Sequence, residues 1–231
     1  MKLTLKPNQV FKFLLFAFIL LLIGNLLGIY LILEKGYVYE KSIVRIFSFD
    51  LEQNLPAFFS TGLFLLSATL LFLIGRNKKS KYKLHWLALS IIFFFLALDE
   101  AISIHELFNY SMRNIFGATG YFHFAWVIPY AVVSILVLIA FTKFLLALPK
   151  RTTLIMILAG ILFVSGAIGM EMIAANYVNE FGDYQYIGTY MVFFTIEESL
   201  EMLGLILFIY GLLDFMGLTN LKPLKLKVKG K

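Results

Sequence analysis

Six long apolar runs divide the chain. They cover about residues 11–33, 55–75, 84–108, 121–148, 153–177 and 187–215. Each run is close to the roughly 20 residues that an α-helix needs to cross the hydrocarbon core of a bilayer. The first run is too long for the apolar part of a signal peptide, so we interpret it as a span. We therefore predict an all-α, polytopic membrane protein: a six-helix transmembrane bundle forming one integral membrane domain over residues 1–231.

The composition agrees with this class of protein. Of the 231 residues, 61% are hydrophobic and the mean hydropathy is +0.87, whereas a soluble domain is about half apolar. The net charge of +6 arises from basic residues in short loops and tails. We therefore expect membrane lipid, and no nucleic acid, as a partner. The chain has no cysteine, which excludes disulfides and thiolate metal ligands.

The charged segments between the runs predict the orientation. Basic residues gather in the N-terminal segment, at 76–83, at 149–151 and in the tail at 216–231, whereas the segments at 34–54, 109–120 and 178–186 are mixed or acidic. With six spans, every basic segment falls on one side, which the positive-inside rule makes cytoplasmic. We expect both termini to be cytoplasmic and the protein to lie in a bacterial inner (plasma) membrane.

Three local signals refine the spans. Residues 43–51 predict a short interfacial helix on the outer side. Gly24 and Gly28 are spaced so that another helix can approach the first span closely. Pro129 predicts a kink in the fourth span, because proline removes a hydrogen bond from a helix interior.

Polar residues interrupt three of the runs where hydrocarbon is expected. They are Asp99, Glu100, His105 and Glu106 in the third run, Glu171 in the fifth, and Glu197, Glu198 and Glu201 in the sixth. At 1.5 Å per residue, all three runs place these groups in the outer half of the bilayer. His123 begins the fourth run on the same side, whereas His85 lies near the inner side. We expect the three runs to converge on one polar site.

Helical spacing indicates which groups share a face. Asp99, Ser103 and Glu106 stand at i, i+4 and i+7, which places them on one stripe of the third helix. Glu201 is spaced from both Glu197 and Glu198 so that it can share a face with either one.

The seven acids have almost no counter-charge, because the outer halves of the runs contain no Lys or Arg. An ionised carboxylate in a membrane costs several kcal/mol unless it is compensated. A metal ion can supply the positive charge, protonation can neutralise carboxylates that lie close together, or water can fill a cavity that opens outward.

Our leading hypothesis is a membrane enzyme with a divalent metal, namely iron, zinc or manganese. The predicted ligands are Asp99, His105, Glu106, His123, Glu171, Glu198 and Glu201, and the predicted catalytic carboxylates are Glu100 and Glu197. A metal in the outer half of a bilayer suits a lipid or lipid-linked substrate, and a hydrolase or an oxidoreductase would fit.

Two comparisons limit this hypothesis. Di-iron helix bundles carry a Glu-x-x-His pair, but residue 102 is Ile, so the likeness stops at composition. Membrane hydrolases of the ceramidase type are similar in being multi-span with an intramembrane metal, yet they use more histidines than the three present here.

Two alternatives remain open at this point. Intramembrane acids often bind cations or relay protons, so a proton- or cation-coupled transporter or channel-type protein is the first. Against it, the inner halves of the runs are nearly free of polar residues, and no inverted repeat is evident. The second is a non-catalytic membrane partner subunit, in which the acids hold helices together or line a wet vestibule.

Overall fold

The fold is described from a computed structural model over residues 6–38, 42–77, 82–182 and 187–219. All regular elements within these residues are helical, and six helices are long and apolar enough to cross a membrane. This confirms the all-α class and the number of candidate spans. Residues 220–231 of the basic tail lie outside the described residues.

The elements follow one another in this order: α1 (Pro7–Lys35), α2 (Ser42–Phe47), α3 (Leu55–Arg76), α4 (Lys83–Ile102), α5 (Ile104–Phe116), η1 (Gly120–Phe122), α6 (Val127–Leu146), α7 (Lys150–Val164), η2 (Ser165–Met170), α8 (Glu171–Phe181) and α9 (Ile187–Leu218). Together α7, η2 and α8 make one continuous span, Lys150–Phe181.

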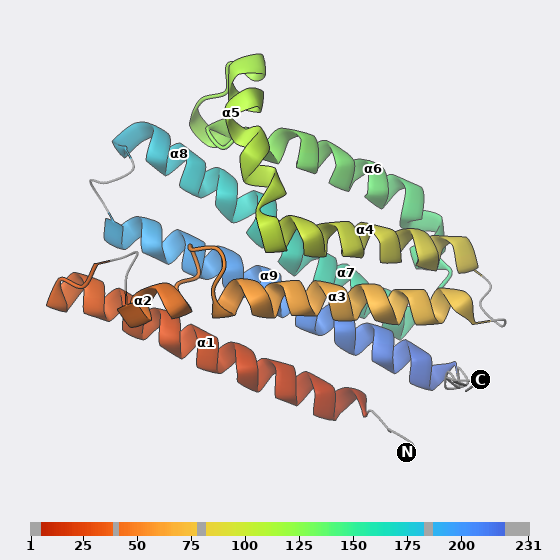
Figure 1. Cartoon of the computed structure of the whole chain (residues 1–231). Coiled ribbons are helices and arrows are strands. Elements are labelled where there is room, and N and C mark those ends of the chain that lie inside the picture. Colours follow the sequence, from red (N-terminus) through yellow and green to blue (C-terminus); the bar gives the residue numbers. More distant parts are fainter. Residues whose placement is uncertain (1–5, 39–41, 78–81, 183–186, 220–231) are drawn as a thin grey trace, which may run out of the picture.

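Helix α9 is the central helix, with α1, α3 and α7 packed against it (Figure 1). The start of α1, the ends of α3, α6 and α9, and the starts of α4 and α7 lie at one end of the bundle. We call this the inner end, and the end that carries α2 and α5 the outer end. The helix ends that adjoin the basic segments thus gather at one end of the bundle. That this end faces the cytoplasm stays a prediction.

The inner half is closely packed by large apolar side chains. Trp86 is 1% exposed, with its ring centroid 4.8 Å from that of Phe144 and 5.0 Å from that of Phe215. These contacts join α4, α6 and α9. Ile74 of α3 and Ile209 of α9 are completely buried. The inner half therefore forms a closely packed, mainly apolar core that holds the spans together.

The third predicted span is divided into two helices. Helix α4 ends at Ile102, and Ser103 adopts a left-handed conformation with φ 51°. A non-glycine residue rarely adopts this conformation, which directs the chain into the separate helix α5. The prediction that Asp99, Ser103 and Glu106 share a stripe of one helix is therefore wrong.

Two further local predictions differ from the structure. Pro129 is the third residue of α6, so it lies in the first turn, where its missing N–H costs no hydrogen bond and no interior kink arises. A short helix does occur in this segment as α2, but it ends at Phe47. It is the element that approaches the glycines of α1: a Cβ at Gly24 would lie 2.5 Å from the ring of Phe47.

A candidate metal centre in the outer cavity

The outer half encloses a cavity of about 430 Å³ between the loop before α3 and helices α4, α5, α6, α7, α8 and α9. We call it the outer cavity. Nine acids and one histidine line it: Asp50, Glu52, Asp99, Glu100, His105, Glu106, Glu171, Glu197, Glu198 and Glu201. No Lys or Arg is among its described lining residues. The cavity thus concentrates nine of the chain's 14 acidic residues.

The sequence-predicted site residues converge with one exception. All seven predicted acids and His105 line the outer cavity. His123 is not among the lining residues, and its Nδ1 lies 3.3 Å from Oδ1 of Asn179 on α8. The structure therefore brings together Asp99, Glu100, His105, Glu106, Glu171, Glu197, Glu198 and Glu201, and places His123 elsewhere at the outer end.

The break after α4 orients His105. Asp99 is 5% exposed, and its Oδ1 accepts a hydrogen bond of 2.8 Å from the backbone N–H of His105. The same oxygen lies 3.4 Å from His105 Nδ1, while Oδ2 accepts a 2.9 Å bond from the Tyr130 hydroxyl. Asp99 therefore caps the first turn of α5 and fixes the imidazole. With Nδ1 held by a carboxylate, Nε2 is left for a ligand.

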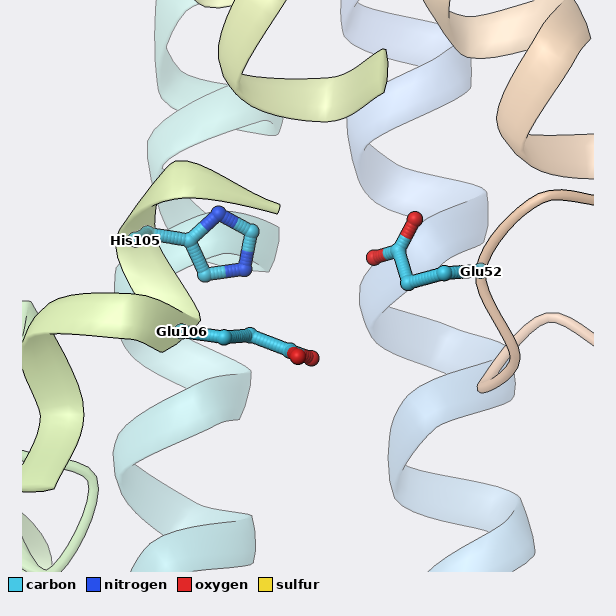
Figure 2. A group of neighbouring side chains, drawn as sticks. All are labelled: Glu52, His105 and Glu106. Carbon is cyan, nitrogen blue, oxygen red and sulfur yellow. The ribbon is translucent and has the colours of Figure 1, made fainter. Parts of the chain in front are cut away.

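Glu52, His105 and Glu106 form a group of metal-type donors in the described part of the chain. One donor atom from each lies within 4.8 Å of the others. Figure 2 shows Glu52 extending from the loop before α3 toward His105 and Glu106 on α5. Ligands of zinc, iron or manganese stand about 2.0–2.2 Å from the ion, so a small side-chain rotation would close the group around one.

Buried amides position the loop that carries Glu52. Asn54 donates to the carbonyl oxygens of Arg45 and Ser48 at 3.0 and 2.6 Å, and its Oδ1 accepts from Ala57 N–H at 3.1 Å as the N-cap of α3. Asn25 of α1 is 2% exposed and accepts a 3.0 Å bond from Phe49 N–H. These bonds satisfy buried backbone groups and hold the loop over the cavity.

The surroundings raise the pKa of two groups at the cavity mouth. Burial, and then the negative charge of Glu106, raise the pKa of Glu52 above its usual 4.5. Burial lowers the pKa of His105, but its hydrogen bond and charge interaction with Asp99 outweigh burial, so this pKa stands above its usual 6.5. Both groups therefore hold their protons to a higher pH than free side chains do.

A π-helical segment shapes the opposite wall. The residues of η2 are wound more widely than an α-helix, a feature that often marks functional sites. A Cβ at Gly166 would lie 2.6 Å from the Glu197 carbonyl oxygen, so only glycine permits this approach to α9. Directly after η2, Glu171 accepts a 2.9 Å bond from the Trp126 indole N–H. The segment thus turns Glu171 toward the cavity.

Sequence reasoning missed several contributors. Asp50 and Glu52 were assigned to a mixed-charge loop, although the predicted orientation placed that loop on the same side as the acids. Trp126 and Tyr130 also contribute, through hydrogen bonds to Glu171 and Asp99, and nothing in their sequence spacing indicates these bonds.

These features define a class: a helical membrane-type protein with six candidate spans and an outer cavity rich in carboxylates. The chain belongs to the family described as "Domain of unknown function (DUF8692)", whose profile matches residues 13–215. That match includes every residue of the outer cavity. Searches of curated proteins and of solved structures returned no match to this chain.

The arrangement is suited to a cation. Carboxylate oxygens and an imidazole are the usual ligands of iron, manganese and zinc in proteins. The nearby carboxylates of Glu100, Glu197, Glu198 and Glu201 have the chemistry to complete a coordination shell or to accept a proton from bound water. Apolar rings such as Phe64, Phe163 and Phe194 line the same cavity, so it presents both polar and apolar surfaces.

Proposed function

We propose that the outer cavity binds a divalent metal ion through Glu52, His105 and Glu106, and that the protein is a metal-dependent membrane enzyme. The observation that carries this proposal is the convergence of these three donors within 4.8 Å at the mouth of a cavity. Asp99 holds His105 from behind, which is the usual arrangement for a metal-binding histidine.

The charge of the cavity supports a bound cation. Several carboxylates share about 430 Å³ with no Lys or Arg along the described lining. Acids within a membrane-spanning bundle are costly unless they are compensated, and a divalent ion compensates two negative charges at once. In this proposal Glu171, Glu198 and Glu201 complete the ligand set, and Glu100 and Glu197 serve as general bases.

A metal ion in this position would act as a Lewis acid and would lower the pKa of a bound water. The chain's own contribution is to orient the ligands and to provide spare carboxylates that take up a proton. Acids beside aromatic rings at the outer end of the spans suit an amphipathic molecule, so we propose a lipid or lipid-linked substrate.

Transport is the weaker candidate because, among the described residues, the layer below the cavity is mostly apolar. Below the cavity, Leu71, Ile74, Ile206, Ile209 and Leu212 are all completely buried. An ion moving inward from the cavity would have to cross this packed layer. The geometry therefore favours a site that is entered and left on the outer side.

The test is metal analysis of protein purified in detergent and supplied with iron, zinc or manganese. The His105→Ala variant is compared with His123→Ala, a matched control at the outer end that does not line the cavity. We expect about one or two equivalents of metal in the wild type and in His123→Ala, and a loss of at least about 100-fold in affinity in His105→Ala.

A folded wild type that takes up none of these metals would contradict the proposal, as would equal uptake by His105→Ala. Glu52→Gln and Glu106→Gln extend the test to the other two donors, with Glu180→Gln as the control because Glu180 lies on α8 outside the cavity lining. Once the metal is known, release of product from outer-leaflet lipids, with and without a chelator, tests the enzymatic part.

A further inference from the structure

Helix α5 has a polar face and an apolar face, and the polar face is the one that points into the protein. His105, Glu106 and Asn109 face the outer cavity. Leu107, Phe108 and Ile115 lie on another side of the helix, because Ile115 follows Phe108 by seven residues and Leu107 by eight, which is about two turns. An amphipathic helix in a soluble protein turns its apolar face inward, whereas α5 turns its polar face inward.

The outward face of α5 is uncovered. Leu107 is 74% exposed, Ile115 68% and Phe108 47%. Large side chains gathered at this exposure need a partner, because a contiguous apolar patch in water is unfavourable. Figure 1 shows α5 projecting away from the long helices at the outer end of the bundle.

We infer that this face lies in the outer interfacial layer of the lipid bilayer. Only Ser103 separates α5 from α4, whose last residue, Ile102, is 62% exposed as part of a candidate span. At its start, the apolar face of α5 thus continues the exposed apolar surface of α4. Tyr121 and Phe122, which follow in η1, are also exposed at this end, where aromatic side chains favour the headgroup region.

The position of the positive charge on α5 also supports contact with the lipid bilayer. Arg113 is exposed, and it stands two residues before Ile115, so the two side chains point about 200° apart around the helix. With Ile115 in the acyl-chain boundary, Arg113 faces the phosphate layer and water. Toward α4 the apolar patch has no polar border of the kind that a soluble partner's interface would have, because it continues into the exposed Leu98 and Ile102 of a candidate span.

This inference deepens the proposed function and, in its consequence for the metal, rests on it. His105 and Glu106 are carried by α5, so the bilayer that holds the helix would also hold two of the three proposed ligands. The lipid contact itself requires no metal, and it is measured separately.

The experiment uses the lack of native cysteine. Single-cysteine variants Ile115→Cys, Leu107→Cys and Arg113→Cys are spin-labelled and placed in nanodiscs of phosphatidylcholine with phosphatidylglycerol. Collision with oxygen reports depth in lipid, and collision with a water-soluble nickel chelate reports contact with water. We expect the ratio of oxygen to nickel accessibility to be at least about threefold higher at 107 and 115 than at 113, because only the former face the acyl chains.

Equal ratios at the three positions would overturn the inference, since α5 would then lie in water. Dipolar broadening at 115 that disappears on dilution with unlabelled protein would also overturn it and would identify a second copy as the occupant. Leu107 and Ile115 report independently, so a failure of one variant to fold leaves the other. Because the labels are measured in metal-free protein, this result is distinct from the metal analysis.

Discussion

The outer and inner halves of the bundle share the long spans but differ in most local features. The inner half contains regular helices and a core such as Trp86, Ile206 and Leu212. The outer half contains the left-handed Ser103, the π-helical η2, an irregular loop and the acids of the cavity. Packing of the inner core stabilises the fold. Part of this stabilisation offsets the repulsion between the carboxylates that line the outer cavity.

This comparison also explains where irregular backbone occurs. Each deviation places a polar side chain: Ser103 allows Asp99 to reach His105, and η2 precedes Glu171. In a membrane, unpaired backbone groups are tolerated only where protein or a polar cavity meets them. Variants that treat the two halves differently test the division.

The largest effect on stability is expected in the inner half. Leu212 is completely buried, so Leu212→Ala should cost about 2–5 kcal/mol of unfolding free energy through lost contacts and a cavity. Reversible unfolding in mixed micelles measures this change, with Leu218→Ala as the exposed control on the same helix. Metal bound per folded protein should not change. A variant that stays stable yet loses metal would contradict the division into two halves.

Asn25→Ala should affect both properties, because Asn25 connects α1 to the cavity loop. The variant loses the bond from Asn25 Nδ2 to Thr195 Oγ1 and leaves Phe49 N–H without its acceptor. We expect a loss of about 1–3 kcal/mol and a fall of about tenfold in metal affinity through displacement of Glu52. Asn179→Ala, an exposed asparagine, is the control. Unchanged metal affinity would show that the loop carrying Glu52 does not contribute to metal binding.

Gly166→Ala should be destabilising, whereas Gly160→Ala on the same span should not. The added Cβ at position 166 would meet the Glu197 carbonyl oxygen at 2.6 Å, and at position 160 it meets nothing within 4 Å. Overpacking at 166 is expected to cost about 1–3 kcal/mol, whereas alanine at 160 should be neutral or better, because glycine weakens helices. Thermal melts of the pair measure this difference. Equal melting temperatures would contradict this prediction, because they would mean that η2 can move away from α9 at little cost in free energy.

Removing acids should trade metal binding against stability. The double variant Glu198→Gln/Glu201→Gln relieves crowding of carboxylates, so metal-free protein should melt a few degrees higher, about 1 kcal/mol for a chain of this size. The same variant should bind metal more weakly. Glu180→Gln serves as the control outside the cavity. A lower melting temperature without metal would mean that these acids contribute structural hydrogen bonds.

The smallest effect concerns pH. The pKa values of Glu52 and His105 are raised in the metal-free protein, so their contribution to stability is present at low pH and is lost as pH rises through the folded pKa values. A metal must displace these protons, so its affinity should increase over the same range. Melting temperatures with and without metal from pH 5 to 8 measure both trends. An affinity that is independent of pH would contradict binding through His105.

Hydrophobic patterning was sufficient for the architecture because crossing a membrane requires long apolar helices whatever their neighbours are. The six candidate spans follow from this patterning, and so does the position of the acids along each span. Helical spacing was less reliable. It placed Glu106 on the same helix as Asp99, and no local signal marked Ser103 as the point where α4 ends.

The sequence by itself determined that seven acids and His105 would lie in the outer halves of a helical bundle, because depth depends only on position along a span. Only the tertiary structure decided which groups meet. Glu52 lies near His105 because Asn25 and Asn54 hydrogen-bond to the backbone around the loop that carries Glu52, and α1, this loop and α5 are far apart in the chain. His123 shares the side but not the cavity, because direction around a helix axis is set by packing rather than by depth.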